Sequence, residues 1–379
     1  MINSNMPQDS IFERLKSNNG TMFSYYARPK TFTSGGVSTT KSEWLTAFKD
    51  FGVKNIEEVY MEGGLEPTTF ENHSIPIRHI FKHRVFAFPT QFHLLREPNS
   101  VFYLHEGWTL SNIVLAFFCC ITKSPYIVMP HGVYDPNIVK KIKLRFLRKI
   151  GEKFVLTNAL FVHVFFKIEI NHIRQISRRA SILVAPTGVN PAKFKRFGWR
   201  GDGDYFLYAG RLDPYMKGLD LLLKAYKESG VSQKLILAGP DYNGGRKELE
   251  KLILQLGIID SVVFVGNLEQ IELLQFVRGC KGFLHISRWE SFGRSAVDAL
   301  SVGSPTLISD QMNLSHCSYI TDFCFVTNLS IRNIALKIRQ IAALNREEFA
   351  ESIRLKQDIF FREYSWTNSV QKLTNSADE

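Results

Sequence analysis

Short apolar runs alternate with amphipathic stretches along most of the chain, and this alternation constrains the fold more than any other feature. In the first half the runs are MFSYYA, SVFYLH, YIVMP, ALFVHV and SILVAP, at 22–27, 100–105, 126–130, 159–164 and 181–186. Strands that alternate with helices indicate parallel sheets covered by helices on both faces. The first half is therefore predicted to be an α/β domain.

The second half repeats the pattern more regularly. Strands are expected at 205–210, 234–239, 262–266, 282–287 and 305–310, with helices at 218–228, 246–256 and about 292–300. Such a strand-helix series is typical of a Rossmann-type sheet. A short apolar strand at FCFVT and further helical segments complete the chain.

A loss of periodicity separates the two halves. The segment NPAKFKRFGWRGDGD, at 190–204, is rich in glycine and charge, as interdomain linkers are. A length of 379 residues also favours two α/β-sized domains with a cleft. We expect an amino-terminal domain at 1–195, a second domain at 196–355, and a carboxyl-terminal helix at 356–379 that packs back across the linker.

Composition narrows the class of protein. Hydrophobic residues make up 45% and charged residues 22%, as in soluble globular proteins. The five cysteines form no CxxC pair and no zinc-site spacing, so we expect a reducing compartment and no metal. The amino terminus lacks the pattern of an export signal. The longest apolar stretch, at 113–121, is shorter than the roughly 20 residues of a membrane span and predicts a buried helix. These features predict a cytoplasmic protein.

The net charge of +11 favours a polyanionic partner, such as nucleic acid, anionic lipid or a phosphate-bearing small molecule. The basic residues are spread over the chain and no nucleic-acid-binding module is recognisable. Nucleic acid is therefore not the expected partner.

One basic segment of the second half has the chemistry of a diphosphate site. Arg211 and Lys217 lie on one loop, after a predicted strand and before a helix, in YFLYAGRLDPYMKGLDLLLKAY. Ligands bind at the carboxyl ends of strands in open α/β sheets, and a guanidinium beside an ammonium suits a diphosphate. The alternative is a pair of solvated surface cations.

A second segment adds acids and a helix start. Glu290 lies in the loop after a predicted strand, and the backbone N–H groups of Ser291, Phe292 and Gly293 form an anion site at the expected helix start. Asp298 follows about two helical turns later. Paired carboxylates beside a phosphate site suggest recognition of sugar hydroxyls. The alternative is a helix-start acid and an exposed helical acid. The segment is GFLHISRWESFGRSAVDALSVGSPTLISD.

Together these stretches resemble the retaining nucleotide-sugar glycosyltransferases of family four, in which two Rossmann-like domains face each other across a cleft, the type B architecture. The resemblance rests on AGRLDPYMKGLDLLLKA, LILAGP, VVFVGN and the segment that carries Glu290, in the order of that family. TSGGVS, FYLHEGW, IVMPHGV and APTGVN match more loosely, so that 22–370 is covered. Asp298 stands where the family's Glu-x7-Glu motif has its second Glu.

The resemblance implies roles for the residues of the second half. Arg211 and Lys217 neutralise the charge of the leaving nucleoside diphosphate, Glu290 contacts the donor sugar, and Asp298 binds the ribose. The reaction retains anomeric configuration, with the leaving phosphate as base, and needs no metal and no cofactor. The donor is a nucleoside diphosphate sugar.

The resemblance also points to residues in the first half. It implies that Gly35 and Gly36 approach the donor phosphates and that His131, an expected catalytic residue, orients the transferred sugar. His105 is a second-rank site residue. The alternatives are a flexible turn for the glycines and packing roles for the histidines.

The stretch VKKIKLRFLRKIGEKF, at 139–154, places Ile142, Phe146, Ile150 and Phe154 on one helical stripe amid lysines and arginines. Such a helix suits an anionic membrane surface or a phosphate-linked lipid. The alternative is a core-facing helix with a solvated basic face. Many relatives of this family assemble surface polysaccharides, so the expected acceptor is a saccharide or a polyprenyl-diphosphate-linked saccharide, at the inner face of the membrane.

Other interpretations compete with a metal-independent transferase. Asp202 and Asp204 resemble the DxD metal motif, but they precede a strand and are interpreted as a solvated turn. The shorter Asp298 keeps open a catalytically silent scaffold that binds a sugar nucleotide or a membrane. An epimerase of the same architecture is also possible, whereas a phosphorylase would need a pyridoxal lysine motif that is not found.

Overall fold

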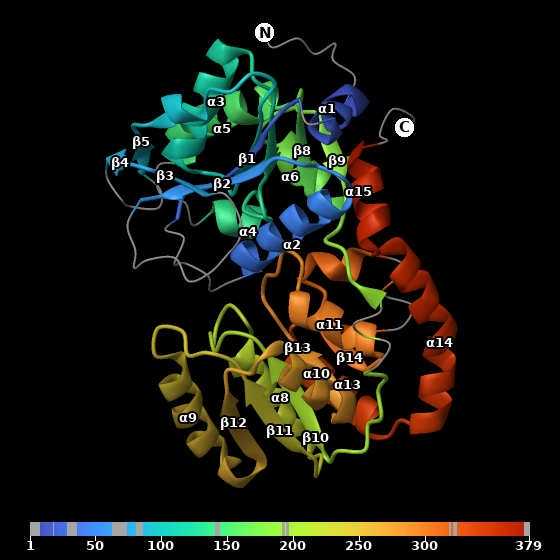
Figure 1. The fold of residues 1–379 in the computed structure, drawn as a ribbon. Coiled ribbons are helices and arrows are strands. Elements are labelled where there is room, and N and C mark those ends of the chain that lie inside the picture. Colours follow the sequence, from blue (N-terminus) through green and yellow to red (C-terminus); the bar gives the residue numbers. More distant parts are fainter. Residues whose placement is uncertain are drawn as a thin grey trace. The chain divides into compact units, whose positions relative to one another are not determined.

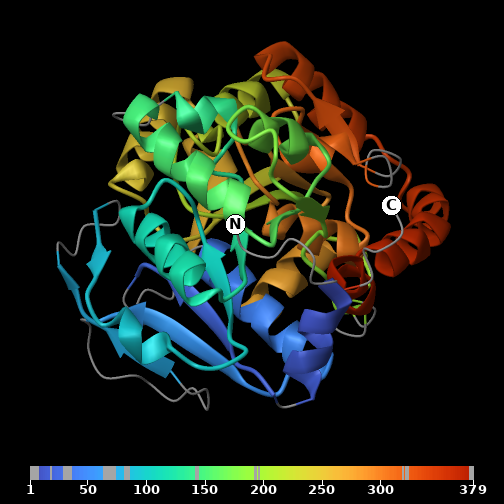
Figure 2. The same ribbon diagram turned by 90° about the horizontal axis from the view of Figure 1, so that it is seen from above.

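The computed structural model of the chain describes residues 8–17, 19–28, 36–62, 74–80, 86–140, 145–191, 194, 197–317, 320 and 324–374. The chain divides into two compact units (Figure 1; Figure 2). Unit 1 comprises Met1–Gly188 and Trp366–Glu379, and unit 2 comprises Val189–Ser365. This division falls seven residues before the expected domain boundary at 195, and it splits the expected carboxyl-terminal segment between the units.

Unit 1 contains a parallel sheet in the order β3-β2-β1-β6-β7-β8-β9. The predicted strands of this half are present, but two others were not predicted. One of these carries two glutamates and the other a proline at the sheet edge, so neither has a continuous apolar run. The strands are β1 Met22–Tyr26, β2 Ile56–Met61, β3 Ser74–Ile77, β6 Val101–His105, β7 Tyr126–Met129, β8 Phe161–Val164 and β9 Ile182–Val184.

Helices cover both faces of this sheet (Figure 1). From β1 the strand order runs one way to β2 and β3 and the other way to β6 through β9. Because crossovers between parallel strands are right-handed, connections that run in opposite directions place their helices on opposite faces. One layer contains helices that follow β6 and β7, and the other contains α2, α1 and α15, which pack together. The bounds are α1 Gln8–Lys16, α2 Gly36–Asp50, α3 Leu110–Thr122, α4 Pro136–Val139, α5 Arg145–Asn158, α6 Ile168–Arg174 and α15 Trp366–Thr374, with β4 His79–Ile80, β5 Phe88–Pro89 and η1 Phe92–Leu95 beside α3.

Two predictions about the apolar stretches need correction. The stretch at 113–121 is helical, as α3, but it is not fully buried: Phe117 is 59% and Ile121 67% exposed. The predicted stripe at 139–154 is split as well. Ile150 is 73% exposed, whereas Phe154 packs against the core. The side chains of Ile142 and Phe146 lie outside the described residues.

Helix α15 is anchored in unit 1 by its first residue. The indole of Trp366 meets that of Trp44 edge-on, with ring centroids 5.1 Å apart. A Cβ on Gly188 would come within 2.5 Å of the Trp366 ring, so this contact needs glycine. The last helix therefore packs on both α2 and β9. Its aromatic contact is with Trp44 of α2.

Unit 2 contains a second parallel sheet, in the order β12-β11-β10-β13-β14-β15, which is the Rossmann order. The predicted strands are all present, and α11 begins at Arg294, two residues later than expected. The elements are β10 Tyr205–Ala209, α8 Leu219–Ser229, β11 Lys234–Ala238, α9 Gly245–Leu256, η2 Ile259–Ser261, β12 Val262–Gly266, α10 Gln270–Gly279, β13 Gly282–His285, α11 Arg294–Val302, β14 Thr306–Ser309, η3 Asn313–His316, β15 Phe325–Thr327, α13 Ile331–Ala342 and α14 Arg346–Glu363.

The strand order reverses between β10 and β13 in unit 2, and between β1 and β6 in unit 1. Neighbouring connections leave a sheet on opposite faces at such a point, which opens a crevice at the carboxyl ends of the two strands. In unit 2 the loops that follow β10 and β13 touch here. A Cβ on Gly218 would lie 1.8 Å from the carbonyl oxygen of Ile286.

Two glycines at the ends of α8 allow a matched test of this contact. Gly218 and Gly230 have φ of 63° and 64°, but nothing lies within 4 Å of a Cβ placed on Gly230. We expect Gly230→Ala to lower the free energy of unfolding by about 1 kcal/mol, the cost of a left-handed alanine. Gly218→Ala should cost at least ~2 kcal/mol more, because the Ile286 carbonyl must move. Equal losses in urea titrations of the two variants would contradict the close approach of the loops.

Candidate functional site

An ion pair joins the loops at the switch point of unit 2. The Nζ of Lys217, from the loop after β10, donates to Oε2 of Glu290, from the loop after β13. The two side chains are only 13% and 17% exposed. Both were predicted site residues, and the structure brings them together.

The Glu290 carboxylate has a second neighbour beneath it. The Nε2 of His285, the last residue of β13, lies 3.5 Å from Oε2 of Glu290, and its Nδ1 is 3.3 Å from the Ser295 hydroxyl. Burial alone raises the pKa of Glu290, but the Lys217 ammonium and the His285 ring outweigh it and lower the pKa to about 2. Glu290 is therefore ionised and acts as a hydrogen-bond acceptor.

Arg288 fastens the same two loops together. Its guanidinium donates to both carboxylate oxygens of Asp220, at 2.6 and 2.8 Å, and lies 4.3 Å from the ring centroid of Tyr215. Its backbone N–H donates to the carbonyl of Met216. Arg288 was not among the residues predicted from the sequence, although a basic residue two positions before Glu290 was a visible signal. The fork fixes the position of Lys217 relative to Glu290.

Arg211 lies at the entrance to this loop and is exposed. Its guanidinium stands 4.6 Å from the ring centroid of Tyr242, and its carbonyl accepts from the Tyr208 hydroxyl at 2.9 Å. The backbone is thereby held while the guanidinium stays accessible. Arg211 and Lys217 thus present two cations on one loop at the edge of the sheet.

Helix α11 begins where the loop after β13 ends. Because it begins at Arg294, its first free backbone N–H groups belong to Arg294 and the residues after it, rather than to the expected 291–293. Phe292 is buried, and Gly293 has φ of 76°, where a Cβ would lie 2.7 Å from the Met312 methyl. Asp298 is buried in the second turn, with the Arg294 guanidinium 3.9 Å away.

The switch point of unit 1 contains a chain of hydrogen bonds. His105 Nε2 lies 3.1 Å from the Ser24 hydroxyl, and His105 Nδ1 lies 3.0 Å from Nε2 of His131. These residues come from β1, the end of β6 and the turn after β7. The structure therefore brings His105 and His131 together, with Ser24 as a partner that the sequence did not single out.

Both imidazoles are buried and neutral. Burial lowers the pKa of His131 to about 3, with a smaller contribution from His163. Burial likewise lowers the pKa of His105 well below its usual value, and nearby His131, Lys41 and His163 add to this. A neutral His131 can donate or accept a hydrogen bond but supplies no positive charge.

Unusual backbone conformations concentrate at the same edge of unit 1. His131 has φ of 53°, and Glu106 and Trp108, in the loop after β6, have φ of 66° and 60°. Non-glycine residues are rare in this region, and they gather at functional sites. These loops are therefore a second candidate site in the chain.

Two further features were singled out in the sequence, the glycine pair at 35–36 and the pair Asp202 and Asp204 that resembles a DxD motif. Gly35 lies outside the described residues, and Gly36 is the first residue of α2. Asp202 and Asp204 lie in the irregular segment before β10. In the part of the chain that the structure describes, no three His, Cys, Asp or Glu side chains are grouped as metal ligands.

A comparison with models of protein families gives a match for the second half of the chain. Residues 189–373 match the family model of glycosyl transferases group 1. This stretch covers unit 2 and continues into α15, and it includes Arg211, Lys217, Glu290 and Asp298. The resemblance that the sequence motifs indicated is confirmed.

Curated relatives match over part of their length. A GDP-mannose:cellobiosyl-diphosphopolyprenol alpha-mannosyltransferase of Xanthomonas campestris is 33% identical over 130 residues, which are 34% of this chain and 34% of the relative. A D-inositol 3-phosphate glycosyltransferase of Mycobacteroides abscessus is 30% identical over 174 residues, 42% of this chain and 39% of the relative. The chain therefore matches only a third to two-fifths of the length of these two proteins.

Solved structures share the fold over almost the whole chain. HepE of Anabaena, in complex with UDP and glucose, has a TM-score of 0.73 at 16% identity and covers 94% of this chain and 98% of its own. Sucrose-phosphate synthase of Thermosynechococcus elongatus has a TM-score of 0.75 at 17% identity, with 93% and 97% covered. The predicted fold class, with two Rossmann-like domains, is confirmed.

The buried neutral histidine predicts a pH dependence of stability. Below about pH 6.5 the unfolded chain binds a proton at His131, which the folded chain binds only near pH 3, so stability falls as pH falls. Between pH 6.5 and pH 5 this residue should account for about 1.5 kcal/mol of the lost free energy of unfolding. We expect His131→Gln to make the decline shallower by that amount in urea titrations.

The control is His93→Gln, since this exposed side chain of η1 meets water in both states. The His93 variant should reproduce the wild-type pH dependence. An unchanged decline in the His131 variant would show that His131 is protonated, or accessible to solvent, in the folded protein.

Proposed function

We propose that this chain, whose residues 189–373 are a glycosyl transferases group 1 domain, transfers a sugar from a nucleoside diphosphate sugar to a saccharide or lipid-linked saccharide, with retention of anomeric configuration. The observation that carries this proposal is the Lys217–Glu290 pair at the β10–β13 switch point. In this proposal, Lys217 is the cation for a diphosphate and the neighbouring Glu290 is the acceptor for a sugar hydroxyl.

In the proposed donor site, Lys217 exchanges the Glu290 carboxylate for the diphosphate of the donor. A bound diphosphate offers Lys217 a second anion, and Arg211 adds a forked donor from the same loop. Glu290, ionised at neutral pH, then accepts a hydrogen bond from a hydroxyl of the donor sugar. Asp298, one methylene shorter than glutamate, would reach a ribose hydroxyl from α11.

Charge neutralisation is the main catalytic contribution in this proposal. As the bond between sugar and phosphate breaks, negative charge grows on the leaving diphosphate, and Arg211 and Lys217 stabilise it without a metal or cofactor. The leaving phosphate then takes the proton of the acceptor hydroxyl, so no protein nucleophile is needed. Neutral His131 would orient the transferred sugar by a hydrogen bond.

The relatives suggest the kind of acceptor. The Xanthomonas relative is named for a diphosphopolyprenol-linked disaccharide and the Mycobacteroides relative for inositol 3-phosphate, so both act on phosphorylated acceptors. We propose a phosphate-bearing acceptor for this chain too, in the assembly of a surface polysaccharide or glycoconjugate.

A donor screen tests the proposed function. Thermal stabilisation is measured with UDP-, GDP- and ADP-sugars, and nucleoside diphosphate release is measured with the same donors and an added phosphorylated saccharide acceptor, with and without EDTA. We expect at least one donor to stabilise the protein and to be turned over equally well in EDTA. Arg211→Ala or Lys217→Ala should weaken its binding at least about tenfold, since each removes a charge-assisted hydrogen bond.

Lys227→Ala is the matched control, because Lys227 is an exposed lysine at the opposite end of α8. Stabilisation without release of nucleoside diphosphate would favour the catalytically silent scaffold. If no donor stabilises the protein, or if the Arg211 and Lys217 variants bind as the control does, the donor site is wrongly assigned.

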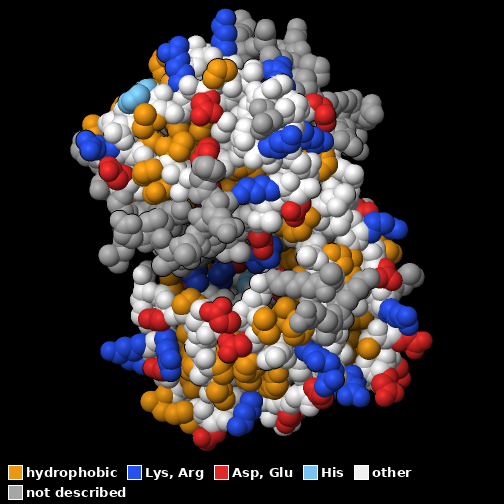
Figure 3. Space-filling view, viewed as in Figure 1, with side chains coloured by type: hydrophobic (Ala, Val, Ile, Leu, Met, Phe, Trp, Pro, Cys, Tyr) orange, Lys and Arg blue, Asp and Glu red, His pale blue; other side chains and the backbone are white. Residues whose placement is uncertain are grey.

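A membrane surface is the second proposed partner, and one face of unit 1 supports it. The exposed large hydrophobic side chains of this unit, among the described residues, gather on packed neighbouring elements from β4 to α5. Basic side chains are interleaved with them, in the upper left part of Figure 3. We call this face the apolar surface; its members are Ile80, Phe86, Phe88, Leu94, Phe117, Ile121 and Ile150.

The chemistry of the apolar surface suits an anionic leaflet. Arg148 lies 5.3 Å from the Phe86 ring centroid, and Lys149 and Lys153 are exposed on the same helix. Apolar side chains that enter the interface beside lysines are typical of peripheral proteins. No described helix has the length and apolarity needed to cross a bilayer. We therefore propose peripheral binding at the cytoplasmic face.

Vesicle sedimentation tests this proposal. Vesicles that contain phosphatidylglycerol should bind the protein at low salt, and Phe117→Ser with Ile121→Ser should lower the binding at least about fivefold, because two exposed side chains no longer enter the interface. Ile259→Ser with Ile271→Ser is the control, since these side chains of unit 2 are 62% and 61% exposed. Equal binding by both double variants would overturn the assignment of this face.

A further inference from the structure

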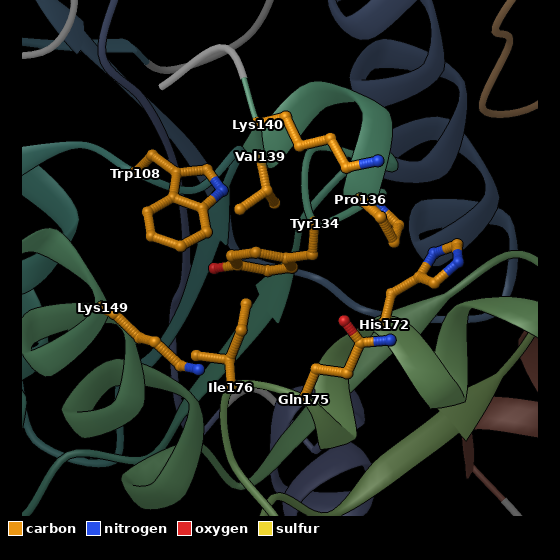
Figure 4. Close-up of a pocket in the computed structure, with 9 residues that line it drawn as sticks. All are labelled: Trp108, Tyr134, Pro136, Val139, Lys140, Lys149, His172, Gln175 and Ile176. Atoms are coloured by element: carbon orange, nitrogen blue, oxygen red, sulfur yellow. The ribbon is translucent and has the colours of Figure 1, made fainter. Parts of the chain in front are cut away.

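A pocket in unit 1 lies beside the candidate site and has no assigned ligand. It is formed by the loops after β6 and β7 and by α5 and α6, all at the carboxyl edge of the sheet. Its volume of about 270 Å³ is near the lower limit of small-molecule pockets, roughly 300 Å³. Figure 4 shows the lining residues: Trp108, Tyr134, Pro136, Val139, Lys140, Lys149, His172, Gln175 and Ile176.

The aromatic walls of this pocket are held rigidly from behind. The carboxylate of buried Glu152 accepts from the backbone N–H of Trp108 at 2.7 Å and from the hydroxyl of Tyr134. The indole N–H of Trp108 donates to the carbonyl of Val133. The two rings meet at 65°, with centroids 5.6 Å apart. Their polar atoms are thus occupied inside the protein, and the rings turn apolar surface toward the pocket.

Two cations stand at the rim of these apolar walls. Lys140 follows α4 and Lys149 belongs to α5, and Figure 4 shows their side chains on opposite sides of the Tyr134 ring. Neither ammonium is within 4 Å of a carboxylate in the described part of the chain. Among the described residues that line the pocket, none is Asp or Glu. The pocket therefore attracts an anion, and its walls favour an apolar neighbour to that anion.

The position of the pocket relates it to the transfer reaction and to the apolar surface. Tyr134 lies three residues after His131, in a turn closed by the bonds from Val133 to Pro130 and from Asp135 to Gly132. At the other side, Lys149 at the rim is followed directly by Ile150 of the apolar surface. A ligand that enters this pocket can thus extend toward either feature.

We infer that this pocket binds the phosphoryl group of a prenyl phosphate, with Lys140 and Lys149 supplying positive charge from opposite sides of the rim and with Trp108 and Tyr134 against the first carbons of the chain. The pocket is too small for a long lipid chain, which continues to the apolar surface. This inference rests on the proposed function, in which the acceptor saccharide is carried by a prenyl diphosphate that presents one of its phosphoryl groups to this pocket. A phosphosugar, which has no apolar chain, is the main competitor for the site.

Isothermal titration with geranyl phosphate, in the absence of any donor, tests this inference. We expect saturable binding that Lys140→Gln with Lys149→Gln weakens at least tenfold. The control is Lys153→Gln, an exposed lysine one turn farther along α5 that does not line the pocket. Binding that is absent, or that is equal in the double variant and the control, overturns the inference.

Two further ligands separate the contributions of phosphate and chain. Geraniol, which lacks the phosphate, and glucose 1-phosphate, which lacks the chain, should each bind at least tenfold more weakly than geranyl phosphate. If glucose 1-phosphate binds as tightly as geranyl phosphate, the pocket recognises a phosphosugar instead. Because no donor is present, the pocket can fail this test while the donor screen succeeds, so the two failures are distinguishable.

Discussion

The ion pair between Lys217 and Glu290 is the interaction on which the candidate donor site depends. Removing two charges from water costs several kcal/mol each, so a largely buried pair does little for stability by itself. The pair matters for position more than for stability, because it holds a cation and an ionised carboxylate next to each other at the ends of the strands. In the proposed mechanism, a diphosphate that competes for Lys217 would release the carboxylate toward a sugar. On this proposal the pair is a preorganised donor site and not only a structural contact.

The rest of unit 2 explains why this pair stays in place. Gly218 lets the β10 loop approach the backbone of Ile286, and the fork from Arg288 to Asp220 ties the loop after β13 to the first turn of α8. His285 supports Glu290 from the end of β13, where it is paired with Ile308 of β14. These contacts hold the loops in one arrangement before any ligand binds, and such preorganisation limits the entropy lost on binding.

Unit 1 follows the same plan with different chemistry. Its switch point holds neutral imidazoles in place of cations, and its loops contain several left-handed residues. The burial that keeps His131 uncharged also makes it a poor ligand for phosphate, so an anion must be met by other groups. Lys140 and Lys149 stand beside the same loops and supply that charge.

How far the sequence predicted this structure depends on the range of each interaction. The strands of unit 2 and the loop with Arg211 and Lys217 were predictable, because apolar runs and turn residues are local signals. Strand β2 was not, since its glutamates hide the alternation. The contact of Lys217 with Glu290 joins residues 73 positions apart, so it depends on the order of the strands and not on a local pattern. The hydrogen bonds from Trp108 and Tyr134 to Glu152, which hold the pocket walls, had no local signal in the sequence.

A crystal structure of this chain with a nucleoside diphosphate tests the central claim most directly. We predict the diphosphate at the carboxyl ends of β10 and β13, within hydrogen-bond distance of Lys217 and Arg211, with the bond from Lys217 to Glu290 lengthened or broken. A diphosphate bound elsewhere, with the Lys217–Glu290 pair unchanged, would contradict the claim.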